Sequence, residues 1–435
     1  MTTELKGRSA PDTADGGAAL RGQTGDGAPG PAAGEPSAAA PAEGERAPVE
    51  TTAKEAAVMR SFSFVFYMTM ALTVSFFPLY FSDKGYSTLQ IGAIYSIGPL
   101  IGIAANLFWG YASDRLRTIR KVLLVMLFGQ LLTTIVLTQI DAIAWLYVAM
   151  TVYNFFHTPI NALNDSLTLL SIRRSKRSFA SFRVWGSLGF AFSSVVFGTV
   201  LHIVGVNRTL LFAIGTISLS LLLAFFLKDR VRGGSSAKQV RVSEFWSVLK
   251  QPSLLLFLAL IFTMSFAHRT NDGFLALSMR ELGASDTIVG WAWTASALSE
   301  IPMFVWLSKN GHRYKELPLL MIASFFYAVR FFLVSIVSDP LWFIPLQLMH
   351  SVTFGIFLVT ALRYIQQLIP DDFRATGQAL YNIVWSCLAG LASGLIGGWV
   401  FETWGFPVMY KVAAASGLLA CLGFFLTYRY QRSRE

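Results

Sequence analysis

Long runs of apolar residues dominate the chain between residues 60 and 428. Each run has about the 20 residues that a helix needs to cross a bilayer. The runs lack the alternation of apolar and polar residues that is typical of membrane β-strands. The pattern therefore predicts an all-α integral membrane protein with twelve transmembrane helices, at 60–81, 90–111, 122–140, 144–170, 182–204, 209–227, 254–279, 287–307, 318–337, 341–364, 376–400 and 406–428.

Basic residues recur in every second loop of this pattern. They gather at 115–121, 173–177, 228–250, 309–315, 374 and 429–434, whereas the alternate loops hold little beyond Lys84, Arg208, Arg280 and Lys411. Because cytoplasmic loops carry the excess of Lys and Arg, this alternation predicts that both termini are cytoplasmic. The long loop 228–253 divides the helices into two sets of six, at 58–227 and 254–428, followed by a short cytoplasmic tail at 429–435.

The composition agrees with a membrane protein. Of the 435 residues, 54% are hydrophobic and 14% are charged, against about 25% charged residues in soluble domains. We expect a multi-pass protein of the cell membrane and assign the net charge of +10 to helix orientation, not to nucleic-acid binding. Residues 1–57 are rich in Ala, Gly and Pro and are predicted to form a disordered cytoplasmic tail. The only cysteines, Cys387 and Cys421, lie in apolar segments, so we expect no metal site and no cofactor.

Three titratable residues stand alone inside apolar segments of the second half. Glu300 is the only charged residue between Trp291 and Leu307, and Arg330 and His350 occupy the two spans that follow. A charged side chain at the centre of a bilayer costs roughly 3 kcal/mol on insertion scales, so all three are expected to face the bundle interior and to neutralise one another. This network could either carry protons or serve structure alone.

Two further polar clusters lie inside predicted spans. The first contains Asn154, His157, Asn161 and Asp165, and Arg183 opens the next span. A carboxylate accepts hydroxyl protons and an arginine fork donates to oxygens, so an Asp165–Arg183 pair could bind a solute or simply hold two helices together. The second cluster, "AHRTNDGF", contains His268, Arg269 and Asp272, and it could equally be a mutually neutralised group near the outer interface.

The segment "GYASDRLRTIRK" at 110–121 resembles the signature loop of the major facilitator superfamily, through Gly110, Asp114, Arg115 and Arg120. The glycine expected after Asp-Arg is missing, and Arg117 lies there instead. We expect Gly110 to allow close helix approach and Asp114 to accept from donors at a neighbouring helix end. Arg115 and Arg120 are expected to hold acidic groups in one conformation.

A narrower resemblance rests on "FRVWGSLGFAF", "ALSEIPMF", "AVRFF", "LMHSVTFGIFLVTALRYI" and "RATGQALYN". These segments are similar to the group that contains lactose permease, nucleoside symporters and phenylpropionate permeases. The resemblance implies the major facilitator fold and proton-coupled symport.

The resemblance also implies roles for individual residues. Substrate binding would fall to Asp165, Arg183, an aromatic platform at Phe190, and His350, with Asn154, His157 and Asn161 nearby. Proton coupling would fall to Glu300, Arg330, His350 and Asp272. One position departs from the family: the proton-carrying glutamate expected three residues after His350 is Thr353, which cannot titrate. The proton would then be carried by Glu300 or Asp272, and we favour Glu300.

These patterns predict a monomeric secondary active transporter that moves a small organic solute with protons by alternating access. A sugar or nucleoside suits Asp165 and His350, whereas an aromatic carboxylate suits Arg269 and Arg330, and the sequence leaves both open. The alternative is proton-driven efflux of amphipathic compounds, which favours a more apolar pocket. An enzyme is disfavoured because nucleophile-elbow, phosphate-loop and metal motifs are absent from the sequence, so we expect no catalytic residues.

Overall fold

The computed structural model describes residues 51–172, 179–229, 251–369 and 374–433. All regular secondary structure in these residues is helical. Most of the predicted tail at 1–57, and most of the predicted linker at 228–253, lie outside the described residues.

The described residues of the first half form seven α-helices, and each predicted span from 60 to 227 corresponds to one of them or to a joined pair. A π-helical segment, Leu72–Phe76, joins the first two. The helices are α1 (Ala53–Ala71), α2 (Phe77–Asp83), α3 (Thr88–Leu116), α4 (Ile119–Leu137), α5 (Ile143–Ile172), α6 (Ala180–Val204) and α7 (Thr209–Ala224).

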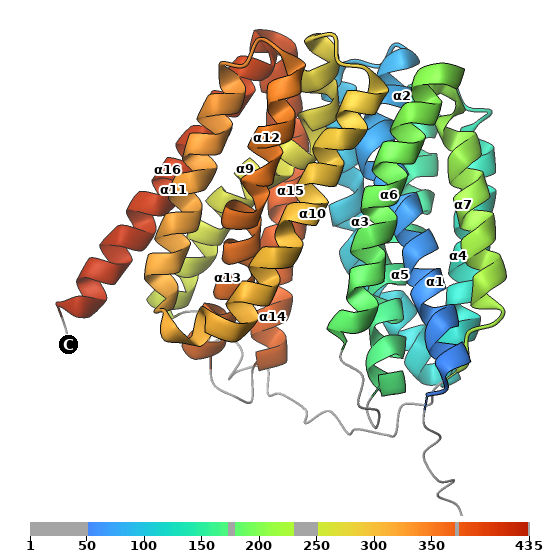
Figure 1. Ribbon diagram of the computed structural model, residues 1–435, viewed down its shortest axis with the longest axis horizontal. Helices are drawn as coiled ribbons and strands as arrows, with labels where there is room; N and C mark the ends of the chain where they lie inside the picture. Colours follow the sequence, from blue (N-terminus) through green and yellow to red (C-terminus); the bar gives the residue numbers. More distant parts are fainter. Residues whose placement is uncertain (1–50, 173–178, 230–250, 370–373, 434–435) are drawn as a thin grey trace, which may run out of the picture. The chain divides into compact units, whose positions relative to one another are not determined.

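The second half is more interrupted. Three π-helical segments, Ser351–Gly355, Ile383–Leu388 and Ser393–Gly397, connect short helices into longer ones. The α-helices are α9 (Pro252–Glu281), α10 (Asp286–Asn310), α11 (Glu316–Ser335), α12 (Phe343–Leu348), α13 (Ile356–Leu368), α14 (Arg374–Asn382), α15 (Ala389–Ala392) and α16 (Gly398–Arg432). In Figure 1 the blue-to-green helices of the first half and the yellow-to-red helices of the second half form two groups.

Ten helical stretches of the described residues are long and apolar enough to cross a membrane. One of them, Leu380–Arg432, is 53 residues long. It contains Gly405, whose φ of 77° is non-helical, so the chain changes direction there. Glycine adopts this conformation without steric cost, and Pro407 follows it where a new helix can begin.

The first helix starts earlier than the sequence predicts. The hydroxyl of Thr52 accepts from the amide of Glu55 at 3.2 Å and caps the start of α1 at Ala53. The hydroxyl of Thr51 donates to the carbonyl of Ser171 at 2.5 Å, and Glu55 pairs with Lys228 at 2.5 Å. The predicted tail at 1–57 is therefore too long at its end, because capping and tertiary contacts hold residues 53–57 in the helix.

The two halves touch through backbone at the end of the bundle where α3 and α10 begin. A Cβ on Gly92 of α3 would lie 2.1 Å from the carbonyl oxygen of Gly394, and a Cβ on Gly290 of α10 would lie 2.1 Å from that of Ser194. Any larger side chain would push these helices apart, so glycine is required for this approach. The halves are therefore in direct contact at this end, opposite the end where α1 begins (Figure 1).

Candidate functional site

Arg330 of α11 is fully buried, with none of its surface exposed. Its Nη1 donates to Nδ1 of His350 at 3.1 Å and to the hydroxyl of Thr353 at 3.3 Å. Its Nη2 donates to Oε1 of Gln347, which is also fully buried. Thr353, at the position where the resemblance expects a glutamate, therefore supplies a neutral acceptor to this arginine.

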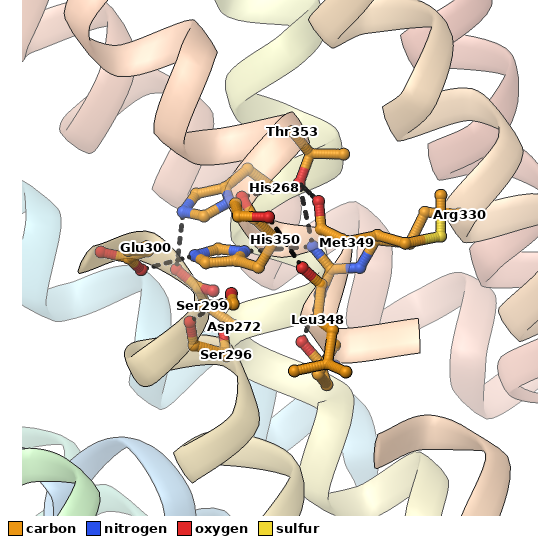
Figure 2. Close-up of polar contacts among 12 residues, drawn as sticks. His268, Asp272, Ser296, Ser299, Glu300, Arg330, Leu348, Met349, His350 and Thr353 are labelled. Atoms are coloured by element: carbon orange, nitrogen blue, oxygen red, sulfur yellow. Dashed lines mark hydrogen bonds and ion pairs between the residues drawn. The ribbon is translucent and has the colours of Figure 1, made fainter. Parts of the chain in front are cut away.

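The contact with Arg330 determines which nitrogen of His350 carries a proton. A guanidinium has donors only, so Nδ1 of His350 must accept, and its proton lies on Nε2. Nε2 is 2.9 Å from Oε1 of Glu300, to which it can donate. We infer a neutral imidazole that connects the positive charge of Arg330 to the negative charge of Glu300, as Figure 2 shows.

A second histidine–carboxylate pair lies beside the first. Nε2 of His268 in α9 is 3.3 Å from Oδ2 of Asp272, and its Nδ1 is 3.0 Å from the hydroxyl of Tyr327. The rings of His268 and His350 stack with centroids 5.5 Å apart. Figure 2 shows Glu300 and Asp272 directed toward this pair of imidazoles. The geometry thus brings together all four predicted proton-coupling residues, and it adds His268.

The polar residues of the first half form a looser cluster. Nη1 of Arg183 in α6 is 3.6 Å from Oδ2 of Asp165 and donates to Oδ1 of Asn161 at 3.3 Å. The hydroxyl of Tyr67 donates to the same Asn161 oxygen at 2.9 Å, and the guanidinium of Arg183 lies over the Tyr67 ring at 5.1 Å. The side chains of Arg183 and Asp165 are 44% and 32% exposed. The structure therefore brings the predicted acid–arginine pair together, in a more open setting than that of Arg330.

Neighbouring residues complete this cluster. Nδ1 of His157 accepts from Nε2 of the buried Gln130 at 2.9 Å, and the His157 ring stacks on Tyr153 with centroids 5.2 Å apart. Phe190 packs edge-on against Trp293 of α10, with centroids 6.0 Å apart. In this arrangement Phe190 is part of the packing between the halves.

A cavity of about 330 Å³ lies between the halves. Four predicted site residues line it: Asn154, His157, Asn161 and Asp272. Arg269, which the sequence associates with a carboxylate solute, lines it too, and its Nη2 donates to Ser386 at 3.1 Å. The volume is typical of a small-molecule site.

The remaining predicted site residues lie elsewhere in the described structure. Asp165 and Arg183 border a separate recess of about 10 Å³, which is too small for a solute. Glu300, Arg330, His350 and Phe190 are outside the lining of the larger cavity. Asp272 therefore links the cavity to the buried network, because it contacts both His268 and Arg269, the latter at 3.6 Å.

π-helical segments supply several of these positions. Thr73 and Val74 come from Leu72–Phe76, Ser386 from Ile383–Leu388, and Ser393 from Ser393–Gly397, and all four line the cavity. A π-helical turn rotates the residues that follow it relative to a regular α-helix. The sequence gives no periodic signal for such a turn, so these lining residues could not be predicted.

The loop between α3 and α4 differs in part from the prediction. A Cβ added to Gly110 would meet nothing within 4 Å, so the prediction that Gly110 permits close helix approach is wrong for this conformation. Arg117 ends α3 with a φ of 49°, a left-handed conformation that favours glycine. Nη2 of Arg120 donates to the carbonyl of Phe225 at 2.7 Å, whereas an acidic partner was expected.

The structure also shows the contacts that other charged residues make at this loop. Asp114 borders a small recess with Gly110, and Nη1 of Arg115 is 3.5 Å from the hydroxyl of Tyr111. Asp229, which the sequence did not single out, accepts from the hydroxyl of Thr118 and from the amide of Ile119, the latter at 2.8 Å. This carboxylate caps α4 and ties the end of the first half to the loop.

A two-part helical bundle with a cavity between its halves and buried charges is typical of a membrane transporter. The chain belongs to the MFS_1 like family, whose model matches residues 57–412. It is thus a multi-pass transporter of the major facilitator superfamily, as the sequence predicts, and neither the family nor the relatives below are enzymes.

Known relatives are transporters of different solutes. The chain is 26% identical over 387 residues to the maltose permease of Geobacillus stearothermophilus, covering 86% of this chain and 94% of that protein. It is 24% identical over 306 residues to the "Probable 3-phenylpropionic acid transporter" of Escherichia coli (strain K12), covering 69% and 80%. The crystal structure of the nucleoside transporter NupG superposes with a TM-score of 0.77 at 15% identity, covering 86% and 99%. The similarity to NupG supports the assignment of the major facilitator fold to this chain.

Proposed function

We propose that this transporter moves a small organic solute together with protons by alternating access. The observation that carries this proposal is the position of Asp272, which lines the cavity and also belongs to the buried charge network. A change of charge in the network therefore reaches the solute site through one side chain.

The proposed proton carrier is Glu300, whose Oε1 lies 2.9 Å from Nε2 of His350. Protonation of Glu300 would remove the charge that balances Arg330 through the neutral His350. Asp272, which is 3.3 Å from Nε2 of His268, would then be the remaining carboxylate of the network. Two conformations that hold Arg330 and these carboxylates differently have different proton affinities, so protonation shifts the balance between them.

The proposed solute forms hydrogen bonds. Asn154, His157 and Asn161 line one wall of the cavity, and Arg269 and Ser386 line the other. Amide, imidazole and guanidinium groups recognise hydroxyls, ring nitrogens or a carboxylate, which fits a sugar, a nucleoside or an aromatic carboxylate. The lining also contains apolar side chains such as Phe66, Met150 and Phe274, so efflux of amphipathic compounds stays the alternative. Asp165 and Arg183 are proposed to complete the solute site when the halves move.

We further propose twelve membrane crossings with both termini in the cytoplasm. The ten stretches identified by length and composition leave out α5, which is 30 residues long, and count the 53-residue stretch as one although Gly405 breaks it. Adding α5 and dividing that stretch gives twelve. We also propose that the monomer is the transporting unit, because both halves of one chain contribute residues to the cavity.

Uptake into proteoliposomes with an inward proton gradient tests this proposal. The probes are radiolabelled maltose, uridine and 3-phenylpropionate, each with and without a protonophore. Gradient-driven accumulation of at least one solute that the protonophore abolishes is expected. Equal uptake with and without the gradient for a transported solute would contradict proton coupling. Asp141→Asn, which changes an 84% exposed carboxylate in a loop, is the matched control and should transport normally.

A further inference from the structure

Among the described residues that line the central cavity, Arg269 of α9 is the one lysine or arginine. Its hydrogen bonds go to neutral acceptors: Nη2 donates to the hydroxyl of Ser386 at 3.1 Å, and Nε donates to the carbonyl of Trp385 at 3.5 Å. The side chain of Arg269 is 31% exposed. A guanidinium has five N–H groups, so Arg269 has more donors than these two contacts use.

Asp272 is the nearest carboxylate to Arg269, but it lies closer to another partner. Its Oδ2 is 3.6 Å from Nη1 of Arg269, which is longer than a hydrogen bond, and 3.3 Å from Nε2 of His268. A solute carboxylate at Nη1 would therefore replace the weaker of these two contacts and leave Asp272 its histidine partner. Since one arginine is present, a solute with one carboxylate is matched, whereas a second carboxylate would be desolvated without a counter-charge.

The neutral polar groups of the lining are engaged with the protein. The hydroxyls of Thr73, Thr158 and Ser393 donate to backbone carbonyls three or four residues earlier, at 3.0, 2.6 and 3.1 Å. Nδ2 of Asn154 donates to the carbonyl of Met150 at 2.8 Å. A hydroxyl that donates to a carbonyl can still accept, but its hydrogen is not available to a solute. The many oxygens of a sugar would thus meet few donors here.

Apolar side chains make up much of the remaining lining. Aromatic rings come from Phe66, Tyr95 and Phe274, and aliphatic groups come from Met70, Val74, Ile94 and Met150. Aromatic rings pack favourably against one another, and an apolar lining with few polar groups is common in small-molecule sites. The cavity therefore combines one cation with surfaces that suit an aromatic ring.

We propose that the solute is an aromatic monocarboxylate and that Arg269 determines this specificity. The carboxylate accepts charge-assisted hydrogen bonds from Arg269, and the ring packs among the apolar lining residues. This inference rests on the proposed function for the location of the solute site, but not on proton coupling.

Binding to the purified full chain in detergent, without a proton gradient, tests this inference. Isothermal titration calorimetry measures the affinity for three acids (benzoate, 3-phenylpropionate and indole-3-acetate), for their three neutral amides, and for maltose and uridine. The variant Arg269→Gln removes the charge, and Arg269→Lys keeps the charge but loses the planar fork. The matched control, Arg208→Gln, removes an exposed cation outside the cavity lining.

At least one acid should bind about tenfold more tightly than its amide, because its contact with Arg269 is charge-assisted. Arg269→Gln should weaken the binding of that acid about tenfold and the binding of its amide by less than about threefold. Arg269→Lys should weaken the binding of the acid by about threefold. Arg208→Gln should change neither affinity.

Equal weakening of acid and amide by Arg269→Gln would overturn the role of Arg269 in specificity, because a structural role would explain it. Tighter binding of maltose or uridine than of every acid, or no binding of any acid, would overturn the solute class. Binding of an acid through Arg269 without gradient-driven uptake would instead contradict the proposed proton coupling and leave this inference standing. Gradient-driven uptake of maltose alone would have the opposite meaning.

Discussion

The two halves of the molecule hold their polar residues in contrasting ways. In the second half, Arg330 is fully buried and bonds at 3.1 to 3.3 Å to His350 and Thr353. In the first half, the side chain of Arg183 is 44% exposed and lies 3.6 Å from Asp165. Removing a partner from a buried, closely bonded arginine costs several kcal/mol of stability, whereas removing one from an exposed arginine costs little. The second half therefore holds its arginine in a closed, buried network, whereas the first half holds its arginine in an open pair.

The largest effect is expected from Arg330→Leu. It leaves Glu300 without its counter-charge and three buried acceptors without a donor, so stability should fall by about 3 to 5 kcal/mol and transport should be lost. Arg183→Leu is the matched change in the other half and should cost less than about 1 kcal/mol of stability. Thermal and denaturant unfolding in detergent measure both. Equal losses would remove the contrast between the halves.

Two fully buried glutamines sharpen the comparison. Gln347 accepts from the charged Arg330, whereas Gln130 bonds to the neutral His157 and Tyr153. Because hydrogen bonds to charged groups are stronger, Gln347→Leu should cost about 1.5 to 3 kcal/mol and Gln130→Leu about 1 kcal/mol. The free energies of unfolding of the two variants test this order. The reverse order would mean that Gln347 contributes little to holding Arg330.

A smaller effect on stability, but a clear one on solute affinity, is expected from Asp165→Asn. The amide keeps the shape and loses the charge, so the half-saturation constant for the transported solute should rise by about tenfold. Stability should change by less than about 1 kcal/mol because the pair is partly exposed. Uptake kinetics at several solute concentrations measure the change. An unaltered half-saturation constant would exclude Asp165 from the solute site.

Much of the fold follows from the sequence because each predicted apolar stretch is long and strongly hydrophobic. The spacing of Glu300, Arg330 and His350 on successive spans also indicated a common site, since each would be costly in lipid. Gln347 carried a weak signal, as it lies three residues before His350 in the sequence. Tyr67 and Tyr327 carried none, because neutral aromatic residues occur throughout membrane helices.

The approach of the halves and the π-helical segments were also beyond prediction. Both depend on which helices pack together, and neither changes the hydrophobic pattern along the chain. Gly110 illustrates this limit: a motif indicated close packing, but the space around it is open in this conformation.

The central claim is that proton coupling passes through Glu300, and solute counterflow compared with gradient-driven uptake tests it most directly. For the solute that wild type transports best, Glu300→Gln should still exchange labelled for unlabelled solute, because the cavity lining is unchanged. A proton gradient should no longer drive its accumulation, because the amide cannot titrate. Accumulation by Glu300→Gln equal to that of wild type under the same gradient would contradict the claim.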